Sequence, residues 1–302
     1  MKTLLNNESV AFYDFIIKLR ESKIDWKYSI MPGNLFEQKF EDDIAGGAKQ
    51  LWLETLYRVH CNVLVSYFKT IRWIDGVNSA IESGVYYSFV SNLRGLIESC
   101  SDSFYSMRSV PLTIGRDFEV ILRTINGTSE NIYITHQNLE NSLIHFSHAS
   151  KLDKEQKKLL PDYMNAKQVR EYLTSISDPQ DEIDTLYSYL CQIVHPASLS
   201  NNIILFFQTN DMYVNGHSKE VERKLIENLI NEFSEVINRT FKIVFANGLT
   251  CLHLLNKFEV NEVQTDLQEI NFGTSEAWDE VQDYINKSKA IYERAIITRV
   301  YE

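Results

Sequence analysis

The sequence predicts an all-α protein, a bundle of long antiparallel helices. Apolar residues recur at the three- and four-residue spacing of a helix through most of the 302-residue chain. Only 11 Gly and 5 Pro are present, and these sparse helix breakers fall between the long helical runs. The hydrophobic content of 44 % and the charged content of 24 % are those of a globular protein. They exclude a disordered chain, a collagen-like fibre and a small disulfide-stabilised protein.

Each helix is predicted from its apolar face and from the residues that cap it. A first helix starts at Asn7 or Ser9, either of which can act as N-cap. A later helix starts at Asp178 as N-cap, with Pro179 at its first position, and ends at His195 before a proline. The other helices are predicted over residues 48–74, 78–107, 115–125, 135–150, 218–257 and, with Thr274 or Ser275 as cap, to about residue 299.

The breaks between the helices are predicted at residues that favour turns. They are the loop Met31-Pro-Gly-Asn34, the break Ala45-Gly-Gly47, the dipeptide Asp75-Gly76 and Pro111. Residues 202–208 are the best strand candidate, and Asn215-Gly216 offers a tight turn after them. We therefore predict one short β-hairpin near residues 202–217, with a buried extended loop as the alternative.

One helical domain is predicted over residues 1–257, followed by a loop and a C-terminal helix over residues 258–302. The formal charge of −11 gives no whole-molecule attraction to nucleic acid. The N-terminus lacks the apolar region of a secretory signal, and no stretch approaches the roughly 18–20 apolar residues needed to span a bilayer. A cytoplasmic protein without membrane contact is therefore expected.

Several well-known catalytic motifs are missing. The sequence has no GxxxxGK[ST] phosphate loop, no GxGxxG after a strand, no GxSxG elbow and no HExxH. The four cysteines, Cys61, Cys100, Cys191 and Cys251, form no CxxC pair and lie in apolar helical contexts, so buried free thiols are expected. ATP hydrolysis, dinucleotide redox chemistry and zinc peptidase chemistry are therefore disfavoured, and no cofactor or metal is predicted.

A first candidate cluster lies inside the second long helix. Arg94 and Glu98 are four residues apart and share one helix face, and Gly95 allows a neighbouring helix to come close. Asp102 extends the same stripe. An exposed ion pair is the simpler interpretation, but the apolar neighbours of the pair also allow partial burial and a functional role.

A second candidate cluster lies on the helix that ends at His195. Tyr187, Cys191 and His195 are spaced by four and stack along one face. Because Pro196 forces the chain to turn, His195 is placed at a helix C-terminus, where the helix dipole favours the imidazolium. Such a histidine suits general acid–base catalysis or phosphate binding, and it also suits the capping of the last carbonyls.

Together, an R-x-x-x-E helix and a later helix ending in Tyr-x7-His-Pro resemble HEPN-like helical proteins of bacteria. The resemblance covers about residues 78–256, with N-terminal helices over residues 9–74 packed on this core. It implies a helical bundle, often dimeric, in bacterial defence or toxin–antitoxin loci, and in many members a metal-independent ribonuclease. The active members carry an arginine before the histidine with four to six residues between the two, and no arginine lies between residues 180 and 195 here.

The resemblance leaves three functions open. The first is a binding or interaction component of a bacterial defence or stress system, acting as a homodimer or with a protein partner. The second is a ribonuclease in which Arg94 stabilises the charge on phosphorus and His195 acts as base or acid, with Glu98 and Tyr187 beside them. The third is a helical scaffold without a reactive site. Lys154, Lys157 and Lys158 form part of the one net-positive stretch and are weak candidates for RNA contact.

Overall fold

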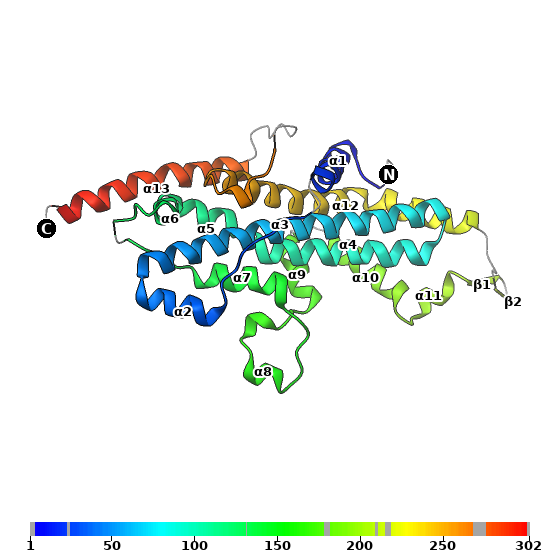
Figure 1. Ribbon diagram of the computed structural model, residues 1–302. Coiled ribbons are helices and arrows are strands. Elements are labelled where there is room, and N and C mark those ends of the chain that lie inside the picture. The colour runs from blue at the N-terminus through cyan, green and yellow to red at the C-terminus, as the bar shows by residue number, and fades with distance from the viewer. Residues whose placement is uncertain are drawn as a thin grey trace. The chain divides into compact units, whose positions relative to one another are not determined.

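The computed structural model describes residues 4–22, 25–130, 132–177, 182–208, 211–214, 219–267 and 276–300. These residues form α-helices, two 3-10 turns and one antiparallel pair of short strands (Figure 1), so the all-α prediction is confirmed. The helices are α1 (Asn7–Ser22), α2 (Gly33–Asp42), α3 (Ile44–Ser83), α4 (Tyr86–Met107), α5 (Val110–Arg116), α6 (Phe118–Asn126), α7 (Gln137–His148), α8 (Gln156–Leu159), α9 (Val169–Ile176), α10 (Ile183–Val194), α11 (Ser198–Asn202), α12 (Lys219–Asn256) and α13 (Glu276–Val300). The 3-10 turns are η1 (Asp162–Met164) and η2 (Asn261–Val263), and the strands are β1 (Leu205–Gln208) and β2 (Asp211–Val214).

The contacts within the chain define two compact units, each made of three stretches of sequence. Unit 1 consists of Met1–Ser22, Ser66–Tyr105 and Lys167–Phe245, and unit 2 consists of Lys23–Val65, Ser106–Ala166 and Ala246–Glu302. This grouping differs from the predicted division at residue 257. The C-terminal helix α13 packs on α5 and α6 inside unit 2 and is part of that unit's core.

In unit 1, the end of α3 and most of α4 form an antiparallel helical hairpin. The predicted break at Asp75-Gly76 is wrong, because α3 continues through both residues to Ser83. Gly76 lies against α4, where an added Cβ would come within 2.6 Å of the Asn92 side-chain oxygen. The chain turns instead at Gly84, whose φ of +67° is a conformation that other residues rarely adopt.

We expect Gly84→Ala to lower the free energy of unfolding by about 1–2 kcal/mol, because an L-residue is strained at positive φ. Urea denaturation followed by circular dichroism measures this loss. Gly33→Ala is the matched control, since Gly33 begins α2 and has no atom within 4 Å of an added Cβ. Equal stability of the two variants would contradict the strained turn.

The N-terminal helix of unit 1 is capped by Asn6 rather than by Asn7 or Ser9. The Asn6 side-chain oxygen accepts from the Ser9 backbone N–H at 2.9 Å, as an N-cap does. The Asn238 side chain of α12 holds this end, since its oxygen accepts from the Asn6 N–H at 2.8 Å and its nitrogen donates to the Leu4 carbonyl at 3.1 Å. The predicted first helix therefore exists, and its N-cap, Asn6, lies one residue before Asn7 and three residues before Ser9, the two predicted caps.

The predicted hairpin near residues 202–217 is present, but it begins later. Residues up to Asn202 belong to α11, and the strand starts at Leu205. Gln208 pairs with Asp211, so the two strands are joined before residue 211, and the predicted turn at Asn215-Gly216 lies after β2 and outside the described residues. Asp178, Pro179, Thr274 and Ser275, predicted as helix starts, also lie outside them.

In unit 2, two further predicted breaks are helical. α2 begins at Gly33, inside the predicted loop at residues 31–34, and α3 begins at Ile44, so the predicted break at residues 45–47 is wrong. An added Cβ at Gly47 would lie 2.6 Å from the Phe40 ring. Glycine is therefore placed where α2 and α3 approach closely, which outweighs its low helix propensity.

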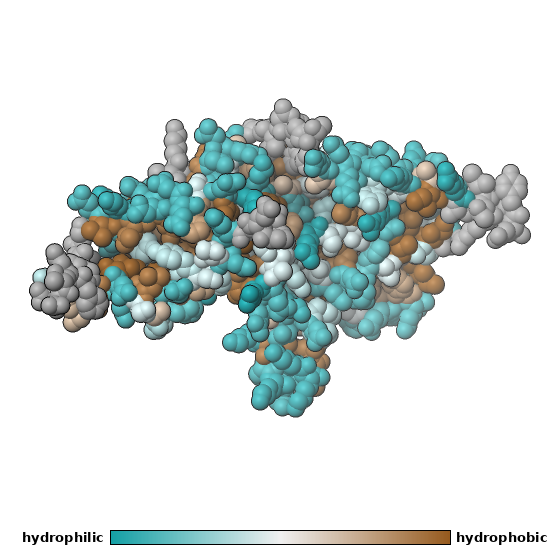
Figure 2. Space-filling model, turned by 180° about the vertical axis from the view of Figure 1, so that it is seen from behind, coloured by the Kyte–Doolittle hydropathy of each residue, from teal (hydrophilic) through white to brown (hydrophobic). Residues whose placement is uncertain are grey.

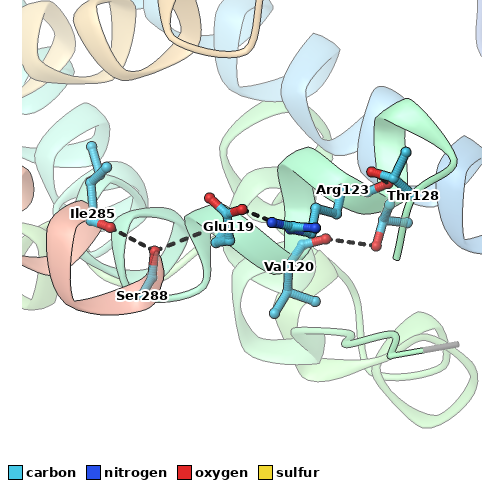
Figure 3. Close-up of polar contacts among 7 residues, drawn as sticks. Glu119, Val120, Arg123, Thr128, Ile285 and Ser288 are labelled. Carbon is cyan, nitrogen blue, oxygen red and sulfur yellow. Dashed lines mark hydrogen bonds and ion pairs between the residues drawn. The ribbon is translucent and has the colours of Figure 1, made fainter. Parts of the chain in front are cut away.

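The remaining helices of unit 2 include α5, α6 and α13. Pro111 does not close the second long helix, which ends at Met107, but occupies the first turn of α5. The predicted helix over residues 115–125 is divided between α5 and α6. Figure 3 shows how α13 attaches to α6: the Ser288 hydroxyl donates to the Ile285 carbonyl at 2.8 Å and accepts from the Glu119 N–H at 3.3 Å.

Asp117, the N-cap residue of α6, makes no side-chain capping bond. Ser288 of α13 therefore supplies the capping hydrogen bond to the first turn of α6. We expect Ser288→Ala to lower the free energy of unfolding by about 1 kcal/mol, the usual cost of losing a cap. Chemical denaturation checks this value. Ser147→Ala is the control, because Ser147 bonds only within its own helix. No difference between the variants would contradict the capping role.

Candidate functional site

Two helices of unit 1, α4 and α10, position the residues singled out in the sequence. Leu186, Leu190 and Ile193 of α10 are buried, and Leu93 and Ile97 of α4 are buried as well. The residues next to these apolar stripes therefore lie at the border between core and solvent. Arg94 and Glu98 occupy this border on α4, and Tyr187 occupies it on α10.

One carboxylate oxygen joins Arg94, Glu98 and Tyr187. The Arg94 Nε donates to Glu98 Oε1 at 2.8 Å, and the Tyr187 hydroxyl donates to the same oxygen at 2.6 Å. The Arg94 guanidinium carbon lies 5.6 Å from the centroid of the Tyr187 ring, within the range of a cation–π contact. Bonds to charged groups are stronger than neutral ones, so this arrangement holds the arginine in one orientation.

His195 completes the cluster from the end of α10. Its Nε2 lies 3.1 Å from Arg94 Nη1. Because a guanidinium N–H can only donate, Nε2 is the acceptor in this contact, which leaves the ring proton on Nδ1. The two candidate clusters, 101 residues apart in the sequence, therefore meet directly.

The position of His195 follows from its neighbours in the chain. His195 is the C-cap of α10, its N–H donates to the Cys191 carbonyl at 2.9 Å, and its backbone is extended, with φ −88° and ψ 155°. Pro196 favours such an extended conformation in the residue before it. The predicted placement of His195 at the end of a helix is confirmed.

Burial and charge set the protonation of the cluster. Burial alone would lower the pKa of Arg94, but interactions with Tyr187 and with the Glu98 carboxylate outweigh it and raise the pKa above its usual value. Burial, and next the hydrogen bond to Glu98, raise the pKa of Tyr187. Arg94 is therefore a fixed cation and Tyr187 a fixed donor, while His195 is exposed to solvent.

Three tyrosines that sequence reasoning missed fix the surroundings of the cluster. The Tyr86 hydroxyl, which is buried, lies 2.8 Å from the Tyr189 hydroxyl and links α4 to α10. The Tyr87 hydroxyl donates to the Ser200 carbonyl of α11 at 2.6 Å. One feature of the sequence could have pointed to Tyr87: it lies seven residues before Arg94, so the two residues share one helix face.

Other candidates named from the sequence lie elsewhere. Asp102 does not extend the site, because it forms an ion pair with Lys69 of α3 at 3.6 Å. Lys154, Lys157 and Lys158 are exposed in unit 2, and the Lys158 ammonium pairs with Glu155 at 2.8 Å. Figure 2 shows that the segment around α8 has a mostly hydrophilic surface, as a solvated helix face does.

The described residues contain no group of three or more His, Cys, Asp or Glu side chains placed to hold a metal ion. His145 Nδ1 lies 2.7 Å from the Tyr163 carbonyl and His148 Nδ1 lies 2.8 Å from the Ser147 hydroxyl, so each has a local partner. All four cysteines are free thiols, and Cys100 and Cys251 are buried as predicted, whereas Cys61 and Cys191 are only half-buried. None of the helices in the described part of the chain has the length and apolar character that crossing a membrane requires.

No protein-family model, no curated protein and no solved structure matches this chain. The four residues that meet are a fixed cation, a carboxylate, a phenol and an exposed imidazole. Cations and imidazoles are the groups that bind phosphate and transfer protons.

Proposed function

We propose that the Arg94–His195 site cleaves a phosphodiester bond of RNA without a metal, in a HEPN-like helical protein of a bacterial defence or stress system. The observation that carries the proposal is the 3.1 Å contact between Arg94 Nη1 and His195 Nε2. A cation and a proton acceptor at this distance can both reach one phosphate and its neighbouring 2′-hydroxyl. If the Arg94 guanidinium and the His195 ring were more than about 10 Å apart, they could not act on the same phosphate, and the reaction would be excluded.

In this reaction His195 acts as the general base. Its Nε2 takes the proton of the 2′-hydroxyl, the 2′-oxygen forms a bond to phosphorus, and the bond from phosphorus to the 5′-oxygen breaks. The imidazolium then returns its proton to the departing 5′-oxygen, directly or through water. The products are a 2′,3′-cyclic phosphate and a 5′-hydroxyl end, so the reaction needs neither an oxidant nor a second substrate.

Arg94 stabilises the negative charge that builds up on the phosphate oxygens. In the free protein, His195 Nε2 accepts a hydrogen bond from the Nη1–H of Arg94. An incoming phosphate accepts this hydrogen bond in its place, so Nε2 becomes free to act as the base. Glu98 and Tyr187 are positioning residues in this scheme. Glu98 holds Nε of Arg94 and Tyr187 holds Glu98, so the outer edge of the guanidinium stays directed at His195.

A second candidate function is binding without cleavage, as an interaction component that forms a homodimer or engages a protein partner. Two observations favour it. Glu98 already pairs with Arg94, which lowers the net positive charge available to a phosphate. The arginine that active HEPN proteins carry on the helix of the histidine is also missing here, because Leu190, Tyr189 and Ser188 stand at that spacing.

Expression in bacteria distinguishes the two functions. We expect the wild-type protein to arrest growth and to fragment cellular RNA, and His195→Ala and Arg94→Ala to abolish both effects. Arg72→Ala is the control, since Arg72 is an exposed arginine on α3 of the same unit and lies outside the cluster. Equal behaviour of all four proteins would overturn the ribonuclease and leave the binding role.

A further inference from the structure

A second site lies in unit 2, in a cavity of about 210 Å³ between α2, α3 and the start of α7. Its apolar walls include Phe36 and Phe40 of α2 and Trp52 of α3, and its polar wall includes His136 and Glu140. The cavity is smaller than the roughly 300–1,000 Å³ of pockets for drug-sized ligands, so it suits a small molecule. None of these residues takes part in the cluster of unit 1.

The aromatic rings of the cavity are held in place. Trp52 is almost fully buried, and its indole N–H donates to the Ile134 carbonyl at 3.0 Å. The His136 ring meets the Trp52 ring edge to face, with centroids 6.0 Å apart. The rings of Phe36 and Phe40 lie 5.7 Å apart and are tilted to each other. Aromatic rings that line a cavity can attract a cation through their negative faces.

The charges around the cavity also favour a cation. Within the described part of the chain, the Glu140 carboxylate has no ion-pair partner, and none of the described lining residues is Lys or Arg. Asp117 lies behind His136, with its Oδ2 2.7 Å from Nε2. The two negative charges of Glu140 and Asp117 exceed the positive charge of a protonated His136 and the roughly half positive charge at the α7 N-terminus together. The net charge around the cavity is therefore negative even when His136 is protonated.

We propose that this cavity binds a small organic cation, an ammonium group that carries methyl or other apolar substituents. The aromatic rings of Phe36, Phe40 and Trp52 surround the apolar shell of the cation, and Glu140 supplies the opposite charge. A metal ion is a poor fit, because the walls offer few oxygen ligands. An anion is disfavoured by both carboxylates.

The test uses the 302-residue chain, isothermal titration calorimetry and two probes of nearly the same shape. Choline carries the quaternary ammonium group, and 3,3-dimethylbutan-1-ol replaces its nitrogen by carbon and is neutral. We expect choline to bind at millimolar concentration or tighter and the alcohol to bind at least about tenfold more weakly, because the ring faces and Glu140 act only on charge. Equal binding of both probes, or no binding of choline, overturns the proposal.

Three variants locate the binding. Glu140→Gln keeps the shape of the side chain and removes its charge, and Phe36→Leu keeps an apolar wall and removes a ring face. We expect each to weaken choline binding about tenfold or more. Glu37→Gln is the matched control, because Glu37 is an exposed carboxylate on α2 that does not line the cavity. Unchanged affinity in Glu140→Gln and Phe36→Leu, with the folded state checked by circular dichroism, would place the cation elsewhere and overturn the assignment.

Discussion

His195→Ala should lower the rate of RNA cleavage by the purified protein by a factor of about 10²–10⁴, the usual contribution of a general base. The same variant should keep its fold, because His195 is exposed at the end of α10. Single-turnover cleavage of a single-stranded RNA, followed by gel electrophoresis in the presence of a metal chelator, measures the rate. A rate within threefold of the wild type, outside the range expected of a lost base, would contradict the mechanism.

Arg94→Ala should lower the same rate by about 10²–10³, because it removes a preorganised donor to the charged phosphate. The two substitutions should not add, since both residues act in one step. Arg72→Ala provides the control for a lost surface cation.

Tyr187→Phe separates positioning from proton transfer. It removes the hydroxyl that holds Glu98, so the rate of RNA cleavage should fall less than in His195→Ala, and the dependence of the rate on pH should keep its shape.

The second large effect concerns the core of unit 1. Phe245 of α12 is almost fully buried and stacks on Phe12, with ring centroids 4.0 Å apart, and on Tyr67, with centroids 5.3 Å apart. The Tyr67 hydroxyl also donates to the Phe245 carbonyl at 2.7 Å. We expect Phe245→Ala to lower the free energy of unfolding by about 3–5 kcal/mol, because it removes both ring contacts and leaves a cavity, while the backbone carbonyl that accepts from Tyr67 remains.

Urea denaturation followed by circular dichroism measures this loss. Since whole proteins are stable by only about 5–15 kcal/mol, Phe245→Leu is measured alongside and should lose less, about 1–2 kcal/mol, because it fills much of the cavity. Ile291→Ala, at a residue 64 % exposed on α13, should change stability by less than about 0.5 kcal/mol. A Phe245→Ala loss no larger than that of Ile291→Ala would contradict the packing.

The sequence gives the local part of the candidate site. The spacing of Arg94 and Glu98 places both on one face of a helix, and they form the expected pair. Pro196 ends α10 and puts His195 at its terminus, because proline restricts only the residues next to it. Both inferences involve residues close together in the chain, where backbone geometry alone decides.

The cavity of unit 2 could not be found in this way. Phe36 and Phe40 lie on a helix that the sequence pattern does not predict, and His136 reaches Asp117 across 19 residues. No motif or spacing in the sequence marks these residues. Only the packing of α2, α3 and α7 brings their side chains around one volume.

The helical spacing of apolar residues by itself determines that this protein is all-α, because a 3.6-residue period buries a stripe only when the backbone is helical. Tertiary structure decides where the helices break and which faces meet. Asp75-Gly76 stays helical since α4 packs closely on Gly76, and the turn falls at Gly84 instead. Arg94 meets His195 because α4 and α10 lie side by side, joined by the bonds from Tyr187 to Glu98 and between Tyr86 and Tyr189, and no local spacing records which helices will be neighbours.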